Sequence, residues 1–89
     1  MKKRTKLEVI KNLLEVLKQN KKVKITHLIY KANLSNNSIK PHIESLLKNQ
    51  FILQEENEGK KMYYITSKGQ EFLDEFKKMK IFEDSYGLG

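Results

Sequence analysis

The stretch NLSNNSIKPHIESLLKNQFI, residues 33–52, decides the fold that this sequence predicts. Asn33 tolerates the left-handed backbone of a tight turn, and Ser35 is a favourable N-cap for a helix that follows it. Apolar side chains then recur at intervals of three and four, which predicts a helix over residues 36–48 with one buried face. The residues of that face are Ile39, Ile43, Leu46 and Leu47.

The first turns of this helix are polar, although residues of these types propagate a helix poorly. A step of about 100° per residue places Asn37 and Pro41 roughly opposite Ile39, so the polar residues lie on an exposed face. Pro41 removes the backbone hydrogen bond that its N–H would make to Asn37. We therefore expect the helix either to kink at Pro41 or to become regular only from about Ser38.

The beginning of the chain also has the apolar spacing of a helix. Thr5 and Glu8 have the spacing of a capping box, which predicts a helix over residues 5–19, and Asn20 is a reasonable left-handed terminator. The apolar residues of this helix are Leu7, Ile10, Leu13, Leu14 and Leu17.

A short segment joins this helix to the turn at Asn33. Residues 23–25 are too few for an independent strand, although they could add an edge to a sheet formed elsewhere. Thr26 can cap a second, short helix over residues 27–32. This helix would bury Leu28 and Ile29.

Asn49 follows the helix over residues 36–48, at a position where glycine often ends a helix. Two β-prone runs come next. They cover residues 51–54 and 62–66, and the polar stretch 55–61 between them contains one glycine and suits a hairpin loop. Thr66 can then cap a last helix. Its apolar residues are Phe72, Leu73, Phe76 and Met79.

The predicted order is helix, short strand, helix, helix, strand, strand, helix. A short helix, a turn of about three residues and a longer helix form a helix-turn-helix, whose second helix enters the DNA major groove. The hairpin directly after it is the wing, so the predicted class is an α+β winged helix-turn-helix. We expect a single domain over residues 1–82, followed by a flexible tail over residues 83–89.

Three stretches resemble the small archaeal winged-helix proteins regarded as transcriptional regulators: IYKANLS at 29–35, LLKNQFI at 46–52 and YYITSKGQEFL at 63–73. In the third, we expect Gly69 to let the last helix pack closely against the sheet. The resemblance implies DNA binding, often as a homodimer joined through the last helix. It names no target gene.

Charge is distributed unevenly along the 89 residues. The net charge is +7, and residues 1–50 carry twelve Lys and Arg against three Glu, whereas residues 51–89 carry six against eight acids. The positive charge therefore lies in the same half of the chain as the helix over residues 36–48, which suits an anionic partner such as nucleic acid. The chain has no cysteine and no run of about 18 apolar residues, so we expect a cytoplasmic, nucleoid-associated protein without disulfides or a membrane span.

The exposed start of the helix over residues 36–48 offers groups that read DNA, because Asn pairs with adenine and Lys reaches guanine or a phosphate. A solvated helix start is the simpler interpretation, but the hairpin and the charge favour DNA. The predicted DNA-binding residues are Arg4, Lys24, Ser35, Asn36, Asn37, Ser38, Lys40, His42, Lys60 and Lys61.

Several of these assignments have alternatives. Lys60 and Lys61 could touch DNA at the wing tip, or belong to a solubilising loop in which Glu55, Glu56 and Glu58 oppose them. The basic arm could enter the minor groove or remain a disordered end. The residues of this arm are Lys2, Lys3, Arg4 and Lys6.

The last helix has a broad apolar band. Phe72, Phe76 and Met79 could form a homodimer interface or simply belong to the core, and the width of the band favours the dimer.

The function predicted from the sequence is that of a double-stranded DNA-binding transcriptional regulator. The alternative is a winged helix that binds proteins within a transcription or replication assembly, since fold does not dictate function. RNA remains possible, although no aromatic stacking surface is evident. No catalytic set, metal cluster, cofactor motif or small-molecule site can be assembled from these residues, so we expect no enzyme.

Overall fold

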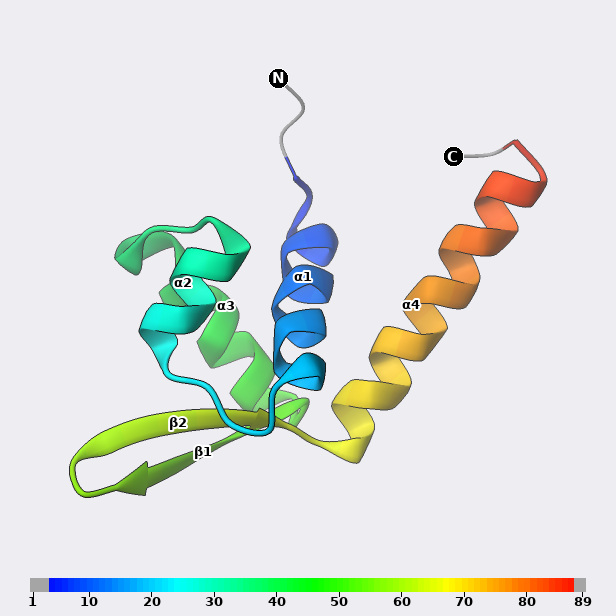
Figure 1. The fold of residues 1–89 in the computed structure, drawn as a ribbon. Helices are drawn as coiled ribbons and strands as arrows, with labels where there is room; N and C mark the ends of the chain where they lie inside the picture. Colours follow the sequence, from blue (N-terminus) through cyan, green and yellow to red (C-terminus); the bar gives the residue numbers. More distant parts are fainter. Residues whose placement is uncertain (1–3, 88–89) are drawn as a thin grey trace.

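The computed structural model describes residues 4–87, so the predicted arm residues Lys2 and Lys3 lie outside the described part of the chain. Figure 1 shows α1 standing between the α2–α3 pair and α4, with a hairpin extending from the base of the helices. This arrangement confirms the predicted α+β winged helix-turn-helix. Its elements are α1 (Lys6–Gln19), α2 (Ile25–Ala32), α3 (Asn36–Lys48), β1 (Ile52–Asn57), β2 (Lys60–Ile65) and α4 (Ser67–Ser85).

The core lies around α1, which contacts α2, α3, β2 and α4. Each fully buried Leu or Ile contributes about 1.5–3 kcal/mol relative to an exposed one, so a small number of side chains holds the elements together. The largest fully buried side chains are Leu13, Leu14, Leu17, Leu28, Ile39, Leu46, Ile52 and Leu73.

The first predicted strand is reduced to one antiparallel bridge between Val23 and Tyr63. The Val23 amide donates to the Tyr63 carbonyl at 2.9 Å, and the Tyr63 amide donates back at 2.8 Å. The strand cannot continue because Ile25 is already the first residue of α2. The bridge therefore supplies the third, minimal member of the antiparallel sheet, at the base of the hairpin.

The start of α2 differs from the prediction. Lys24, not Thr26, is the N-cap residue, and no side chain caps the helix. The amides of His27 and Leu28 donate to the Lys24 carbonyl, at 3.1 and 3.2 Å, so the helix begins before Thr26 can act as a cap.

The turn between α2 and α3 is confirmed. Asn33 has φ 55° and ψ 54°, in the left-handed region. Ser35 and Ser38 cap the start of α3 reciprocally, because each side chain accepts a hydrogen bond from the other's backbone amide. α3 is helical from Asn36 despite Pro41, so the expected late start near Ser38 is wrong: the reciprocal cap holds the first turn in place.

The hairpin is longer and tighter than predicted. Strand pairing runs from Ile52 opposite Ile65 to Asn57 opposite Lys60, so much of the expected 55–61 loop is strand. The connection is Glu58 and Gly59, with φ values of 53° and 77°. Two consecutive residues with positive φ match the right-handed twist of the strands and allow a two-residue turn.

The ends of α1 and α3 also differ from the prediction. Asn20 is extended, with φ −128°, and its side-chain amide donates to the Val16 carbonyl at 2.8 Å instead of adopting a left-handed backbone. After α3, Gln50 takes the left-handed conformation at φ 61°, whereas Asn49 has φ −86°.

α4 begins as predicted, with Thr66 as N-cap. Its hydroxyl accepts from the Gly69 amide at 3.0 Å and donates to the Gln50 carbonyl at 2.7 Å. The Phe51 and Phe72 rings stack at 4.7 Å between centroids. The cap therefore fixes the helix to the segment that leads into the hairpin.

α4 continues to Ser85, so the predicted boundary after residue 82 falls inside the helix. The Phe82 and Tyr86 rings lie 4.7 Å apart, one helical turn from each other, and Lys80 pairs with Asp84 at 4.0 Å. These contacts continue the helix into a segment that has no apolar period of its own. Within residues 4–87, no helix is long and apolar enough to cross a membrane.

Candidate nucleic-acid interface

The exposed face of α3 carries the predicted reading residues. Asn36, Asn37 and Lys40 are exposed, and Ile39 behind them is fully buried. The face is fixed in orientation because Ile39 belongs to the core. Asn37 and Lys40 are thus presented outward on a rigid element, as a groove-reading helix requires.

Ser35 and Ser38 belong to the same exposed turn but are used by the fold. The Ser35 hydroxyl accepts from the Ser38 amide at 3.1 Å, and the Ser38 hydroxyl accepts from the Ser35 amide at 2.9 Å. The two hydroxyls also bond each other at 3.0 Å. Both residues therefore shape the helix start, and only their remaining hydrogen-bonding capacity is free for a ligand.

A groove of about 430 Å³ separates α3 from the hairpin. Lys40 of α3 and Lys61 of β2 both line it, so two predicted residues 21 positions apart in sequence share one concave surface. Glu44 and Gln54 line it as well, and the apolar lining is formed by Ile25, Ile43, Leu47 and Tyr63.

The structure separates Lys60 from Lys61. Successive strand residues point to opposite faces, and Lys61 shares the groove-facing side of β2 with Tyr63. Lys60 points to the other side, opposite Asn57 and next to the turn. The two lysines predicted to lie together at the wing tip therefore have different positions: Lys61 faces the groove, and Lys60 lies beside the turn.

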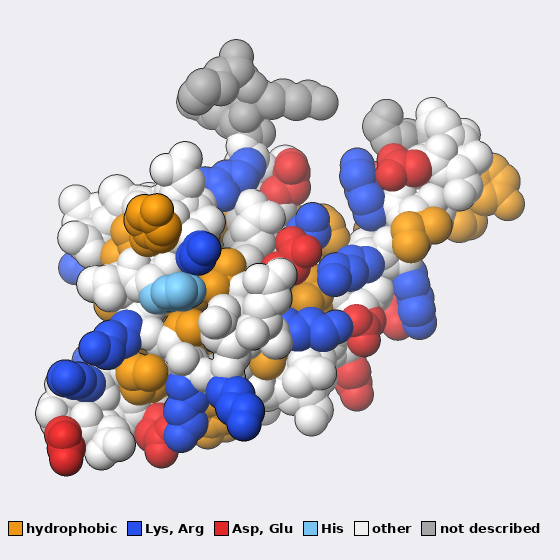
Figure 2. Space-filling view, in the orientation of Figure 1, with side chains coloured by type: hydrophobic (Ala, Val, Ile, Leu, Met, Phe, Trp, Pro, Cys, Tyr) orange, Lys and Arg blue, Asp and Glu red, His pale blue; other side chains and the backbone are white. Residues whose placement is uncertain are grey.

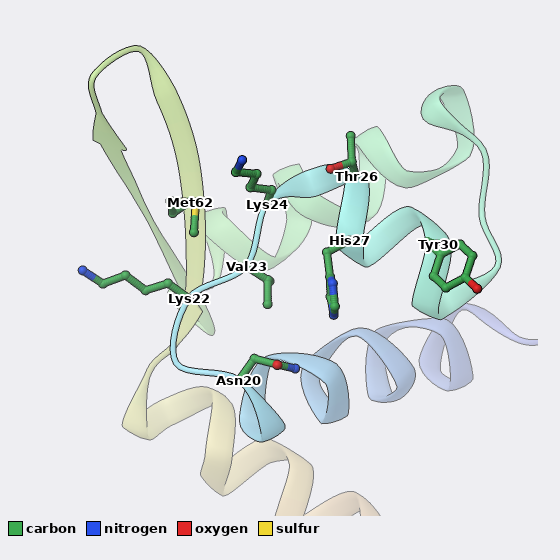
Figure 3. Close-up of a pocket in the computed structure, with 8 residues that line it drawn as sticks. All are labelled: Asn20, Lys22, Val23, Lys24, Thr26, His27, Tyr30 and Met62. Atoms are coloured by element: carbon green, nitrogen blue, oxygen red, sulfur yellow. The ribbon is translucent and has the colours of Figure 1, made fainter.

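Lys24 lies at a second, shallow pocket of about 470 Å³ at the start of α2. Figure 3 shows Lys24 and Thr26 pointing away from α1, whereas His27 points toward it. Lys22, in the same pocket, pairs with Glu55 of β1, whose hydrogen bond and charge raise the pKa of Lys22. Lys24 forms no ion pair with the described residues, so its charge is available to a ligand.

His42 occupies a different environment from the other predicted residues of α3. It is half-buried, and its Nδ1 atom is inaccessible and has no hydrogen-bond partner within residues 4–87. Burial, together with the charges of Lys6 and Arg4, lowers the pKa of His42. This environment differs from that of the exposed residues Asn37 and Lys40 on the same helix, and the predicted DNA contact of His42 stays a prediction.

Arg4 joins the beginning of the chain to the helix-turn-helix. Its Nη2 donates to the Asn33 carbonyl at 3.2 Å. The described start of the basic arm thus lies against the turn that precedes α3. This contact brings its charge to the same end of the molecule as Asn36 and Asn37.

The face shown in Figure 2 carries several basic side chains over the hairpin with acidic ones among them, and acidic and basic side chains also mix along α4. Sequence analysis did not single out three exposed residues near the predicted ones, of which the first and last line the groove: Glu44 and Lys48 of α3, and Gln54 of β1. The 100° step places Glu44 at about 140° and Lys48 at about 180° from Ile39, so the same arithmetic could have found them. Gln54 could not be found in this way, because its position depends on the pairing of the strands.

The apolar band of α4 has two parts. Phe72 stacks on Phe51 and belongs to the intramolecular packing, so the structure does not present it as a free interface residue. Phe76 is half-buried and lines a hollow of about 360 Å³ between α1 and α4, together with Met79. Met79 is nevertheless 60% exposed, and Ile81 and Phe82 after it are 66% and 57% exposed.

Three short helices around a core, followed by a two-stranded wing and a closing helix, define a winged-helix protein. The model of the winged helix-turn-helix family matches residues 3–84, and the chain belongs to this family. The sequence-based resemblance to winged helix-turn-helix proteins is thereby confirmed.

Two solved structures share this fold. One is Sso10a-2, a DNA-binding protein from Sulfolobus solfataricus, with 26% identity, a TM-score of 0.77, and coverage of 94% of this chain and 87% of that one. The other is F93 from STIV, a winged-helix DNA-binding protein, with 18% identity, a TM-score of 0.69, and coverage of 91% and 92%. No curated protein matches the sequence significantly.

Proposed function

We propose that this protein binds double-stranded DNA and regulates transcription, with α3 in the major groove and the β1–β2 wing alongside. The observation that carries the proposal is the groove that both Lys40 of α3 and Lys61 of the wing line. A helix that enters the major groove brings a neighbouring hairpin close to the flanking phosphates. Two lysines at this junction suit that geometry, because each can neutralise a phosphate.

Arg4 and Lys24 support the same orientation. Arg4 is held at the Asn33 turn, just before α3, and Lys24 is exposed at the start of α2. In this pose Arg4, at the described start of the basic arm, lies on the side of the minor groove next to the helix. The net charge of residues 1–50 favours a polyanion in the same way.

The similarity to Sso10a-2 adds independent support. That protein is a DNA-binding protein, and it shares 26% identity with this chain over almost the whole of both. A DNA-binding protein of this kind would work in the cytoplasm, at the nucleoid. We assign it no catalytic activity, because the proposal requires only binding.

The proposal includes a homodimer formed by the outer part of α4. Figure 1 shows the C-terminal half of α4 leaning away from α1, and its apolar residues Met79, Ile81 and Phe82 are more than half exposed. Met79 and Phe82, three residues apart, lie on one face of the helix, and exposed apolar side chains grouped in this way are expected at an interface. A two-fold pair would present two copies of α3 to half-sites along one duplex.

A titration of labelled duplex DNA by fluorescence anisotropy, at 50 and 200 mM salt, tests the proposal. If six or more phosphates are contacted, affinity should fall by about 10³-fold or more between the two salt concentrations. Single-stranded DNA and double-stranded RNA of the same sequence serve as competitors. Absence of duplex binding at 50 mM salt, with the fold intact, would favour the alternative role in protein interaction.

A further inference from the structure

Glu44 is an acidic residue on a surface that is otherwise arranged for a polyanion. It is the only acid in α3, and it is exposed. On the helical wheel it lies at about 140° from Ile39, between Lys40 at about 100° and Asn37 at about 160°. It therefore stands within the row of side chains that would face the floor of the major groove.

The fold does not require this carboxylate. Within residues 4–87, Glu44 takes part in no ion pair and no side-chain hydrogen bond, although Lys40 lies one turn before it. It is in the middle of α3, too far from the N-terminus to interact with the helix dipole. Neither helix capping nor a stabilising charge interaction within the fold therefore explains an acidic residue at this position.

The carboxylate also opposes binding to the DNA backbone. Glu44 lines the groove between α3 and the wing together with Lys40, Lys61 and Gln54. A negative charge there repels phosphates of every sequence equally, so it lowers non-specific affinity. A base edge that donates a hydrogen bond is the part of a duplex that can offset this repulsion.

We propose that Glu44 is a specificity-determining residue that accepts a hydrogen bond from the N4 amino group of a cytosine in the major groove. This inference rests on the proposed DNA-binding function. An ionised carboxylate is an acceptor only, and cytosine presents an N4 donor in the major groove. Guanine presents the acceptors N7 and O6 there, so reversing the base pair sets acceptors against the carboxylate, and no hydrogen bond can form.

Glutamine has nearly the same shape as glutamate but carries an amide, so the substitution Glu44→Gln gives the decisive variant. Gln pairs bidentately with adenine through N6 and N7. The substitution Glu44→Gln should therefore move the preference at one position of the site from cytosine to adenine, and Glu44→Ala should abolish the preference there. The other positions should keep their bases in both variants.

The experiment is selection from a randomised duplex library by the unmodified protein, Glu44→Gln and Glu44→Ala, followed by titration of the selected duplex and of its single-base variants. At the affected position we expect discrimination of roughly fivefold or more for the unmodified protein. Glu71→Gln on α4 removes the same charge from an exposed residue outside the groove and serves as the control. Circular dichroism establishes that each variant is folded.

Three results are possible. A change of base preference at one position, from cytosine to adenine in Glu44→Gln, supports the inference. Unchanged preferences with uniformly tighter binding in both variants overturn it, and Glu44 is then only a repulsive charge on a DNA-binding protein. Failure of the unmodified protein to bind any duplex overturns the proposed function and this inference together.

Discussion

The carbonyl oxygen of Phe51 lies only 2.1 Å from the place that a Cβ atom on Gly69 would occupy. The side chain of Ile65 is 2.8 Å from the same point. A backbone carbonyl cannot give way as a flexible side chain does, so the first turn of α4 can approach the base of the hairpin only with glycine at this position. The close packing of α4 therefore depends on the absence of a side chain at Gly69. The placement of the wing depends on it as well.

Gly69→Ala should therefore destabilise the protein, although alanine is the better helix former by about 1 kcal/mol. Overpacking costs about 1–3 kcal/mol, and here the neighbour that must move is backbone. Urea unfolding of both proteins measures the difference. Gln70→Ala, at the next and exposed position, is the control, and it should leave stability unchanged or slightly higher. Equal stability of Gly69→Ala and the unmodified protein would mean that the helix shifts at little cost.

Lys40→Ala and Asn37→Ala should both weaken DNA binding, but in different ways. A lysine at a phosphate affects all sequences alike, so its loss should reduce the slope of log K against log salt by about one. An asparagine that reads a base should cost roughly 1–3 kcal/mol on the preferred site and little elsewhere. Titrations on a preferred and a random duplex, each at several salt concentrations, separate the two effects. If both folded variants bind like the unmodified protein, α3 does not lie in the groove.

Lys61→Ala should behave like Lys40→Ala, because both residues line the groove between α3 and the wing. Lys60→Ala is the matched control, since the neighbouring lysine points to the other side of β2. We expect the larger loss of affinity for Lys61→Ala in the same titration. A larger effect of Lys60→Ala would place the opposite face of the wing on the DNA.

Pro41→Ala should stabilise the isolated domain, because it restores the N–H that can donate to the Asn37 carbonyl. Proline in a helix interior costs up to about 3 kcal/mol relative to alanine, and Pro41 is exposed, so no packing is lost. We also expect DNA preference to change, since Pro41 lies beside Asn37 on the exposed face. A thermal melt measures stability, and a lower melting temperature for the variant would contradict the prediction.

Phe82→Glu should convert the proposed homodimer into a folded monomer with lower affinity for a paired site. Phe82 is 57% exposed, so a charge there disturbs a second chain more than the core. Phe76→Glu should do the same at greater cost to stability, because Phe76 is half-buried against α1. Light scattering at tens of micromolar reports the mass, and a monomeric unmodified protein would rule out the dimer.

Stability should fall as the pH decreases through the ordinary range of histidine titration. Burial and the charges of Lys6 and Arg4 lower the pKa of His42, so the unfolded chain binds a proton at a higher pH than the folded one. The contribution of the neutral ring is complete above the unfolded pKa of about 6.5 and is lost as pH falls toward the folded pKa. Urea unfolding between pH 5 and 7.5 should show a weaker dependence in His42→Gln than in the unmodified protein.

The sequence by itself determined the features that depend on neighbours along the chain. The period of α3, the cap at Thr66 and the left-handed Asn33 each involve residues within one or two turns, where side-chain spacing and backbone preference act directly. The same holds for the capping box of Thr5 and Glu8. For this reason the bounds of α3 were predicted at residues 36–48 and found there.

Tertiary structure decided which of the predicted residues share a surface. Lys40 and Lys61 line the same groove because strand pairing sets the register of the hairpin, whereas Lys60 is turned away by the alternation of the same strand. His42 lies half-buried near the charges of Lys6 and Arg4, which lower its pKa, and no local pattern encodes that environment. Such placements depend on packing between segments distant in sequence, and periodicity within one segment contains no information about them.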